Sequence, residues 1–292
     1  MPDRVLAVLT APAAGGEADE PYRFVDPAVP LVSAVDLGVT RGDGVFETLG
    51  VGEGRAQAVD AHLARLTRSA AMLDLPAPDE EAWRSAVSAV ADQLSGHVEA
   101  FVKLVYTRGV EGTGQPTGWV LGSPSPDHTV ARTEGVRVTV LDRGLSHDSA
   151  GNLPWLLQGA KTLSYALNMA AGREARRRGV DDALFVSSDG FLLEGPTSNL
   201  LIKDGDRLIT PSTSLGILAG TTQAAAFRFA SGQGMSTSYE VLPRDVLESA
   251  DAVWLLSSVR NAAPIREIDG VERRIDVGFT AALNAYLLAR RE

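Results

Sequence analysis

Lysine is rare in this sequence, and one lysine stands where its particular chemistry could be used. The only lysines are Lys103, Lys161 and Lys203, so arginine supplies almost every positive charge. An ammonium group can lose its proton when it is desolvated, and the free amine can then form a Schiff base, whereas a guanidinium cannot. Lys203 adjoins a turn and Lys103 lies within an apolar strand pattern, but Lys161 follows the apolar loop LPWLLQGA. Position alone favours an ordinary lysine at a helix start, so neighbouring motifs must decide whether Lys161 is catalytic.

The elements that must position Lys161 are a mixture of hairpins and helices. Alternating apolar residues predict strands over 46–51, 101–106, 118–121, 136–141 and 252–256. Turn residues at 188–190 and 204–206 predict two hairpins, which pair 183–186 with 191–193 and 200–203 with 207–210. Helical spacing predicts helices over 61–73 with Asp60 as N-cap, and over 81–94, 162–178, 221–230 and 277–290. Because steady strand-helix-strand alternation is absent, an α+β fold is predicted rather than a doubly wound sheet.

The whole chain has the composition of a globular protein with one large domain or two ordinary ones. It has 292 residues, 45% of them apolar and 22% charged, and no apolar run approaches the roughly 18 residues of a membrane span. The N-terminal stretch lacks the features of a targeting segment, so a cytoplasmic location is expected. The polar, proline-containing segment 123–134 is predicted to link a small N-terminal domain, 1–122, to a C-terminal domain, 135–292.

Composition also excludes several kinds of site. Without cysteine, there can be no disulfide, thiolate zinc site or cysteine nucleophile. The four histidines do not reach metal-ligand spacing, so no metal is expected. The net charge of −10 is not opposed by any basic block, which argues against a nucleic-acid surface. No glycine-rich phosphate motif of the GxGxxG or GxxxxGK type occurs.

Five short motifs follow one another along the chain. They are RGDGVFET at 41–48, HLARL at 62–66, Lys161, EGPTSNL at 194–200 and GILAGTT at 216–222. In this order they resemble the class IV aminotransferase family, the fold-type-IV pyridoxal phosphate enzymes. That family includes branched-chain aminotransferases, D-amino-acid aminotransferases and aminodeoxychorismate lyases. The resemblance extends over about residues 30–265, and five motifs in the family's order are far more specific than any one of them.

The resemblance implies a two-domain architecture, with a small N-terminal α/β domain and a larger C-terminal mixed α/β domain that is similar to a barrel. It implies pyridoxal 5′-phosphate as the cofactor, in the cleft between the domains. The implied substrates are a small-molecule amino donor and a 2-oxo acid acceptor. A homodimer is also implied, in which a loop of the partner reaches each active site, and neither a nucleic acid nor a membrane is expected as a partner.

The resemblance also implies roles for individual residues. Lys161 would form the Schiff base and carry the proton between the substrate Cα and the cofactor, Glu194 would pair with the pyridine nitrogen, and Arg65 would bind the phosphate. Each has an ordinary alternative, since Glu194 could be a surface glutamate, Arg65 a solvated arginine, and Tyr165, one helical turn from Lys161, a core tyrosine. The implied cofactor-binding residues are Arg65, Lys161, Tyr165, Glu194, Ser198, Asn199, Gly220, Thr221, Thr222, Ser257 and Ser258.

One predicted strand and the turn after it bear on the reaction. The segment 101–109 ends in Thr-Arg-Gly and is similar to the same region of D-amino-acid aminotransferases and aminodeoxychorismate lyases. Those enzymes follow the turn with side chains that bind the substrate carboxylate, but 111–115 contains no arginine or histidine here. Arg41 or Arg260 could supply the cation instead, or either could form a structural salt bridge. The substrate-binding candidates are therefore Arg41, Phe46, Lys103 and Arg260.

The predicted activity is transfer of an amino group from a D-amino acid to a 2-oxo acid, with primary amines as a further substrate hypothesis. The alternative is 4-amino-4-deoxychorismate lyase, which would release 4-aminobenzoate and pyruvate for folate synthesis. Both reactions begin with removal of the Cα proton, so the sequence leaves the choice open. A non-catalytic ligand-binding protein would require the loss of Lys161 or Glu194, and both are present.

Overall fold

The computed structural model describes residues 4–10 and 20–290 of the chain. The outer ends of the two predicted domains, at residues 1 and 292, and part of the N-terminal stretch lie outside these residues. The chain folds as two compact units. The first comprises Met1–Pro126, Ala160–Tyr165 and Arg290–Glu292, and the second comprises Asp127–Gly159 and Ala166–Ala289.

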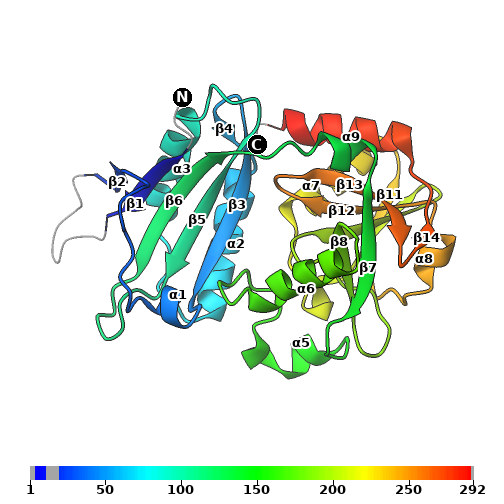
Figure 1. Cartoon of the computed structure of the whole chain (residues 1–292), viewed down its shortest axis with the longest axis horizontal. Coiled ribbons are helices and arrows are strands. Elements are labelled where there is room, and N and C mark those ends of the chain that lie inside the picture. Colours follow the sequence, from blue (N-terminus) through cyan, green and yellow to red (C-terminus); the bar gives the residue numbers. More distant parts are fainter. Residues whose placement is uncertain (1–3, 11–19, 291–292) are drawn as a thin grey trace. The chain divides into compact units, whose positions relative to one another are not determined.

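The first unit is built on a six-stranded antiparallel sheet with the strand order β2-β1-β6-β5-β3-β4 (Figure 1). Its strands are β1 (Val5–Leu9), β2 (Tyr22–Val25), β3 (Gly44–Gly52), β4 (Arg55–Ala56), β5 (Ala100–Thr107) and β6 (Thr117–Pro124). The predicted strands at 46–51, 101–106 and 118–121 are confirmed as β3, β5 and β6. A short helix, α1 (Leu37–Thr40), precedes β3.

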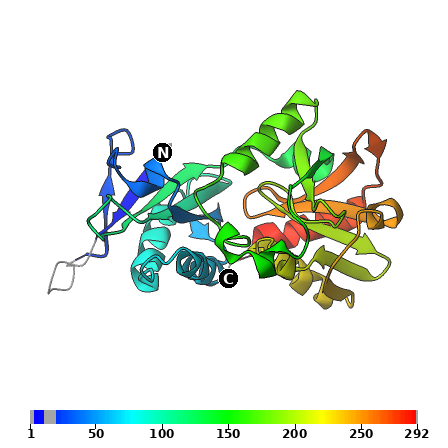
Figure 2. The same ribbon diagram turned by 90° about the horizontal axis from the view of Figure 1, so that it is seen from below.

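Two helices cover one face of this sheet. Helices α2 (Val59–Met72) and α3 (Glu80–Asp92) lie side by side against it in both ribbon views (Figures 1 and 2). Successive side chains of a strand point to opposite faces, so β3 directs Glu47 toward α2 and Phe46 toward the other face. The helices predicted at 61–73 and 81–94 are confirmed.

The N-cap predicted for α2 is wrong. Ala58, in the left-handed region with φ 53°, is the N-cap, and Asp60 lies inside the first turn. There the Asp60 carboxylate forms an ion pair with Arg84 of α3. An acidic side chain in the first turn complements the helix dipole, so Asp60 marks the start of the helix without capping it.

A segment from later in the chain extends the first sheet beside β3. Thr162 forms an isolated antiparallel bridge with Val45, and the Phe46 N–H donates to the Lys161 carbonyl oxygen at 3.0 Å. This non-local pairing keeps the chain extended at Lys161. The predicted helix start at 162 is therefore wrong, because α6 (Ala166–Arg177) begins only in the second unit.

The second unit contains an eight-stranded mixed sheet. Its main path runs β11-β10-β9-β12-β13-β7-β8, and β14 pairs with β13. The strands are β7 (Val136–Asp142), β8 (Asp182–Val186), β9 (Asn199–Asp204), β10 (Arg207–Pro211), β11 (Ser236–Glu240), β12 (Ala252–Ser257), β13 (Asn261–Ile268) and β14 (Val271–Glu272). Parallel pairs (β10 with β11, β13 with β7, β7 with β8) occur beside antiparallel ones. This mixture of pairings confirms the predicted α+β fold, and β9 with β10 confirms the hairpin around 204–206.

Alternation along β12 separates two apolar cores in the second unit. Val253 and Leu255 belong to one cluster of buried residues, most of them on strands, whereas Trp254 and Leu256 pack with residues of the helices at Thr221–Gly232 and Val277–Ala289 in another. A third cluster joins Ala175 of α6 to β8. Besides α6, the helices are α4 (Thr129–Thr133), α5 (Ser149–Asn152), α7 (Thr221–Gly232), α8 (Val246–Ser249) and α9 (Val277–Ala289). Within residues 4–10 and 20–290, no helix is long and apolar enough to cross a membrane.

Two further predictions concern the segments that flank these cores. The hairpin predicted around 188–190 is confirmed by the Phe185 N–H, which donates to the Glu194 carbonyl oxygen at 2.9 Å, and the Leu193 N–H, which returns a bond at 3.0 Å. The segment 123–134 carries more structure than its composition predicts. It includes the end of β6 and all of α4, and α4 packs against β13 and α9.

Candidate active site

Lys161 lies against two aromatic rings in the first unit. Its Nζ is 4.4 Å from the centroid of the Phe46 ring and 5.9 Å from that of Tyr165. These two rings meet edge to face, with their centroids 5.2 Å apart. The Lys161 backbone N–H donates to Ser69 Oγ of α2 at 3.1 Å. The lysine is therefore held by a sheet edge and a helix, which fix its backbone position.

The sequence predicted that Tyr165 lies one helical turn from Lys161. This prediction is wrong, because neither residue is in a helix. The Tyr165 N–H donates to the Leu163 carbonyl oxygen at 2.7 Å, a tight turn that ends before α6 begins. Of the other predicted substrate residues, Phe46 and Lys103 lie on the same half-buried face of the sheet, where Lys103 pairs with Thr48 of β3. The structure thus brings Lys161, Tyr165 and Phe46 into contact, with Lys103 two positions further along that face.

A network of buried charge lies on the opposite face of β3. Glu47 is fully buried, and its two carboxylate oxygens accept hydrogen bonds from Arg65 Nε and Nη2, both at 2.7 Å. His62 Nδ1 lies 2.7 Å from Glu47 Oε2. His62 and Arg65 are three residues apart, which places them on one face of α2. Arg65 is only 5% exposed, so the solvated alternative for this residue is wrong.

The pKa shifts in this network follow from burial and from the charges in contact. Burial would raise the pKa of Glu47, but the charge and hydrogen bonds of Arg65, with those of His62, outweigh it and hold that pKa far below its usual range. Burial lowers the pKa of His62 against the attraction of Glu47, and the positive charges of Arg65 and Lys161 lower it further. At neutral pH the network therefore holds an ionised Glu47 and a neutral His62 beside Arg65.

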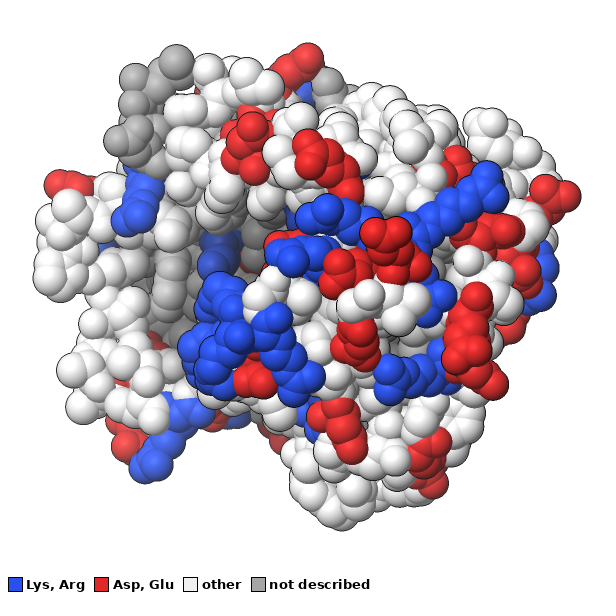
Figure 3. Space-filling view, turned by 45° about the vertical axis from the view of Figure 1, so that its right-hand side comes forward, with Lys and Arg blue, Asp and Glu red and all other residues white. Residues whose placement is uncertain are grey.

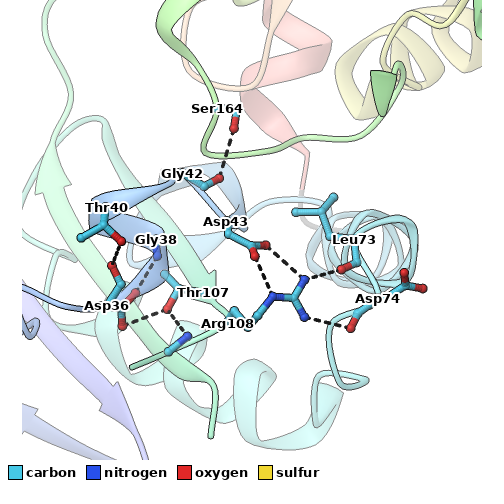
Figure 4. A network of polar contacts seen from close by, with 11 residues as sticks. Asp36, Gly38, Thr40, Gly42, Asp43, Leu73, Asp74, Thr107, Arg108 and Ser164 are labelled. Carbon is cyan, nitrogen blue, oxygen red and sulfur yellow. Dashed lines mark hydrogen bonds and ion pairs between the residues drawn. The ribbon is translucent and has the colours of Figure 1, made fainter. Parts of the chain in front are cut away.

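Figure 4 shows the contacts that hold the RGDG turn at the start of β3. Arg108, the arginine of the Thr-Arg-Gly turn, donates from Nε to Asp43 Oδ2 at 2.6 Å and from Nη2 to the Leu73 carbonyl oxygen at 2.6 Å. The Asp43 contact raises the pKa of Arg108. Ser164, from the lysine segment, donates through Oγ to the Gly42 carbonyl oxygen at 3.3 Å. Arg108 thus serves the structure of the turn.

Arg41 differs from Arg108 in its surroundings. It follows α1 as the C-cap residue and is exposed. Among the described residues, its guanidinium makes no hydrogen bond or ion pair, so the salt-bridge alternative for Arg41 gains no support. Arg41 is the arginine of the RGDG motif with a charge left available to a ligand.

Glu194 lies in the second unit, at the junction of two of the sequence motifs. Its carboxylate accepts a hydrogen bond from Asn199 Nδ2 at 3.1 Å and another from the Leu218 N–H at 3.2 Å. Asn199 Nδ2 also donates to the Leu218 carbonyl oxygen at 2.8 Å. A Cβ at Gly220 would stand 1.9 Å from Asn199 Oδ1, so this packing requires glycine. Glu194 is half-buried and held by amides, unlike a mobile surface glutamate.

Sequence reasoning missed Arg143, which follows β7. Its guanidinium stacks over the Phe185 ring, with Cζ 5.4 Å from the ring centroid, and it has no hydrogen-bond partner among the described residues. Partial burial lowers the pKa of Arg143, while the negative charge of Glu194 opposes that shift. An unpaired, half-buried arginine near the predicted cofactor carboxylate is a candidate ligand-binding group. Only its position after a predicted strand could have signalled it.

The N-terminus of α7 carries a buried hydroxyl that the described part of the chain does not satisfy. Gly220 is the N-cap, and the first N–H groups of a helix have no acceptor within it. Thr222 is 2% exposed, and its Oγ1 has no hydrogen-bond partner among the described residues. The same holds for Ser198 Oγ. Because buried hydroxyls are nearly always hydrogen-bonded, these two hydroxyls are suited to bind a ligand. A helix N-terminus favours an anionic ligand.

The turn between β12 and β13 lies next to this helix end. Thr221 Oγ1 and Ser258 Oγ are 3.4 Å apart, which joins the two segments. The structure thus brings together Thr221, Thr222 and Ser258, with Ser257 at the end of β12 beside them. Arg260 ends the turn, and its Nη2 donates to Asp182 Oδ2 of β8 at 2.8 Å. Arg260 therefore has the structural salt bridge that sequence reasoning left open.

The chain is similar to known proteins over most of its length. The family model for amino-transferase class IV matches residues 44–268. A protein named bifunctional aminodeoxychorismate lyase / D-amino acid transaminase, from Mycobacterium tuberculosis, is 46% identical over 257 residues, which cover 85% of this chain and 89% of that protein. A D-alanine aminotransferase from Bacillus licheniformis is 25% identical over 251 residues, 85% of this chain and 87% of that one.

Solved structures resemble the whole chain. The fold IV-transaminase CpuTA1 from Curtobacterium pusillum matches with a TM-score of 0.94 and 51% identity, over 99% of this chain and 98% of that one. An aminotransferase from Mycobacterium tuberculosis in its PLP-bound form matches with a TM-score of 0.88 and 41% identity, over 98% and 99%. With the lysine, the carboxylate and the helix end described above, these matches show that the chain belongs to the class IV aminotransferase family of pyridoxal-phosphate-dependent enzymes.

Proposed function

We propose that this enzyme is a transaminase that moves an amino group from a D-amino acid to a 2-oxo acid. The observation that carries the proposal is the 46% identity, over 85% of the chain, to a protein whose name includes D-amino acid transaminase. An aminotransferase from Mycobacterium tuberculosis, 42% identical, has a structure in a form bound to α-ketoglutarate, which is a 2-oxo acid, and PMP, the aminated cofactor. The lysine, the carboxylate and the helix end that would serve this reaction are present.

The residues of the second unit fit pyridoxal phosphate. The unpartnered Oγ1 of Thr222, at the N-terminus of α7, supplies a buried donor suited to the phosphate. Ser258 lies against the same helix end through Thr221. Glu194 is a carboxylate held by amides, which suits a protonated pyridine nitrogen. We propose these residues, with Arg65 and Lys161 of the first unit, as the cofactor-binding set.

Bound pyridoxal phosphate would supply an aldehyde for the amine and a ring that withdraws electrons from the substrate Cα. Lys161 Nζ would accept the Cα proton and return it, as a general base held above Phe46. Glu194 would keep the pyridine nitrogen protonated through a charge-assisted hydrogen bond. Phe46 and Tyr165 would limit the access of water to the amine, since both rings lie against it.

The substrate carboxylate needs a cation, and we propose Arg41. Arg108 is engaged by Asp43, and Arg260 is engaged by Asp182, whereas Arg41 has no such partner within the described part of the chain. A guanidinium can bind a carboxylate through two parallel hydrogen bonds. The variant Arg41→Gln should therefore raise the KM for a D-amino acid much more than it lowers kcat, and it should leave turnover of a primary amine unchanged.

A second candidate activity is aminodeoxychorismate lyase. The relative that is 46% identical carries both names, and a lyase from Vibrio harveyi is 26% identical over 243 residues. Both reactions use the same proton acceptor at the substrate Cα, so one site can support both. Release of pyruvate from aminodeoxychorismate by the wild type, and its absence in Lys161→Ala, would establish this activity.

The test of the main proposal is the visible absorbance of the protein with its cofactor, before and after addition of D-alanine. L-alanine and L-leucine serve as comparisons. D-alanine alone should convert the spectrum to that of the aminated cofactor, and α-ketoglutarate should restore it. Conversion by L-leucine and not by D-alanine would contradict the D-specific proposal, and an unchanged cofactor band in Lys161→Ala would contradict the role of the lysine.

We also propose that the enzyme is a homodimer. Apolar side chains are exposed in the second unit around the start of α6, among them Trp155 at 70% exposure and Met169 at 50%. The face shown in Figure 3 carries charge of both signs, with basic side chains grouped near its centre and acidic ones among and beside them. Light scattering should give twice the chain mass, and the variant Trp155→Glu should shift it toward the monomer.

A further inference from the structure

The turn from Ser257 to Asn261 is held from behind by an arginine of the segment predicted as a plain linker. Arg132 of α4 donates from Nε to the Arg260 carbonyl oxygen at 2.9 Å and from Nη2 to the Val259 carbonyl oxygen at 3.0 Å. One guanidinium thus binds two consecutive carbonyl groups. Arg132 is 7% exposed, so these bonds form away from bulk water.

Arg132 fixes the direction of the two peptide groups whose carbonyls it binds, those that join Val259 to Arg260 and Arg260 to Asn261. In a trans peptide, the C=O of one residue and the N–H of the next point in opposite directions. Because the Val259 carbonyl points toward Arg132, the Arg260 N–H points away from it. Neither the Val259 N–H nor the Arg260 N–H finds an acceptor among the described residues. Adjacent backbone N–H groups without acceptors form a concave site that favours an anion.

The same turn is fixed at two other points. Arg260 is held by Asp182 of β8, as described above. Beyond the turn, the Asn284 side chain of α9 accepts from the Ala262 N–H at 3.0 Å and donates to the Ala262 carbonyl oxygen at 2.8 Å. Asn261 adopts the left-handed conformation with φ 61°. Three buried side chains from three elements thus hold a turn in which the Val259 and Arg260 N–H groups have no acceptor in the part of the chain that the structure describes.

We infer that Arg132 is a positioning residue for the cofactor phosphate, because it orients the Arg260 N–H, next to the Val259 N–H, in the turn beside the N-terminus of α7. This inference rests on the proposed cofactor cradle at Thr222 and Ser258. Lysine could not replace Arg132, since one ammonium group lacks the planar fork that reaches two carbonyl oxygens at once. The segment that leads into the second unit therefore supplies part of its phosphate site.

The test compares the affinity of the apoenzyme for pyridoxal phosphate and for pyridoxal, which lacks the phosphate. Equilibrium binding is followed by fluorescence, so activity is not the readout. Arg132→Lys and Arg132→Gln should each bind pyridoxal phosphate about tenfold more weakly, as expected for a weakened charge-assisted hydrogen bond, while pyridoxal affinity changes less than about twofold. The matched control is Arg178→Gln, which removes bonds to Glu174 and Thr139 in the same unit.

The ratio of the two affinities separates a specific effect from general destabilisation. A loss of fold would lower both affinities alike. If Arg132→Gln does not fold, Arg132→Lys still tests the inference, because it keeps the positive charge and most of the side chain. If the wild type prefers pyridoxal phosphate but the Arg132 variants keep that preference, the inference is overturned and the cradle stands. If the wild type binds pyridoxal as tightly as its phosphate, the cradle itself is wrong, and the inference falls with it.

Discussion

The two units handle buried polarity in opposite ways. In the first, Glu47, His62 and Arg65 are buried together, and their charges and hydrogen bonds compensate one another. In the second, Thr222 Oγ1 and the Val259 and Arg260 N–H groups have no partner among the described residues. The first arrangement contributes to folding and presets Arg65. The second adds nothing to the stability of the empty protein and is suited to binding. Substitutions in the first arrangement should therefore change stability, and substitutions in the second should change cofactor affinity.

The largest effect is expected from Glu47→Leu. Removal of the carboxylate takes from the buried Arg65 its ion pair and two hydrogen bonds with Glu47, which costs about 3–5 kcal/mol of unfolding free energy. Urea unfolding followed by circular dichroism measures this. The control is Glu174→Gln, which breaks exposed ion pairs with Arg177 and Arg178 and should leave the midpoint unchanged. Equal midpoints for the two variants would show that the buried network does not stabilise the fold.

The converse result is expected from Thr222→Val. Because the hydroxyl has no partner in the described chain, its loss should leave unfolding of the apoenzyme unchanged, while pyridoxal phosphate affinity falls about tenfold. Thr210→Val is the matched control. Its buried hydroxyl donates to the Leu200 carbonyl oxygen at 2.6 Å, so it should lose about 1 kcal/mol of stability and no affinity. If Thr222→Val lost stability instead, the hydroxyl would have a structural partner.

The pH dependence of stability should report on His62. Burial lowers its pKa in the folded protein below the ordinary value of 6.5, so the unfolded chain binds the proton more readily. Stability is therefore lost as pH falls below 6.5, and the depressed pKa of Glu47 adds a further loss only below 4.5. His62→Gln removes the first loss, and melting temperatures at pH 8, 6.5 and 5.5 would show it. An unchanged slope would mean that His62 is protonated in the folded protein.

The smallest effect is expected from Ser258→Ala. Its hydroxyl is 3.4 Å from that of Thr221, a long contact, so its removal should not change the turn that Arg132 holds. We expect pyridoxal phosphate affinity to fall about threefold, less than in Thr222→Val. The same fluorescence titration measures it, with pyridoxal as the control. A larger loss than in Thr222→Val would make the turn, rather than the helix end, the main phosphate donor.

Local sequence patterns predicted most helices and strands correctly. The errors arose where a contact between residues far apart in the sequence determined the structure. The strand around Phe46 and the hairpin at 204–206 follow from alternation and turn residues, which act over a few positions. The helix start at 162 was predicted wrongly because Thr162 pairs with Val45, far away in the sequence. Helical spacing made Arg65 look solvated, since nothing local shows that Glu47 neutralises it. Local propensity contains no information about partners that are distant in the sequence, such as Val45 for Thr162 and Glu47 for Arg65.

The same limit applies to the candidate site. The motifs located Lys161, Glu194 and Thr222 because their order along the chain resembles that of a family. They did not reveal Arg132, whose function depends on two carbonyl groups more than a hundred residues away, with sequence separations of 127 and 128. Nor did they reveal Arg143, whose significance depends on what surrounds it rather than on its neighbours in sequence.

The lysine segment also has a consequence for the order of synthesis. The first unit takes residues 160–165 from the middle of the chain and Arg290 from its end, and Gln57 Nε2 donates to the Arg290 carbonyl oxygen at 3.3 Å. When residues 1–126 have emerged from the ribosome, the first unit therefore still lacks residues 160–165 and Arg290. We expect the nascent first unit to become resistant to protease only when residue 165 has emerged, because the segment that carries Lys161 completes the sheet that holds it.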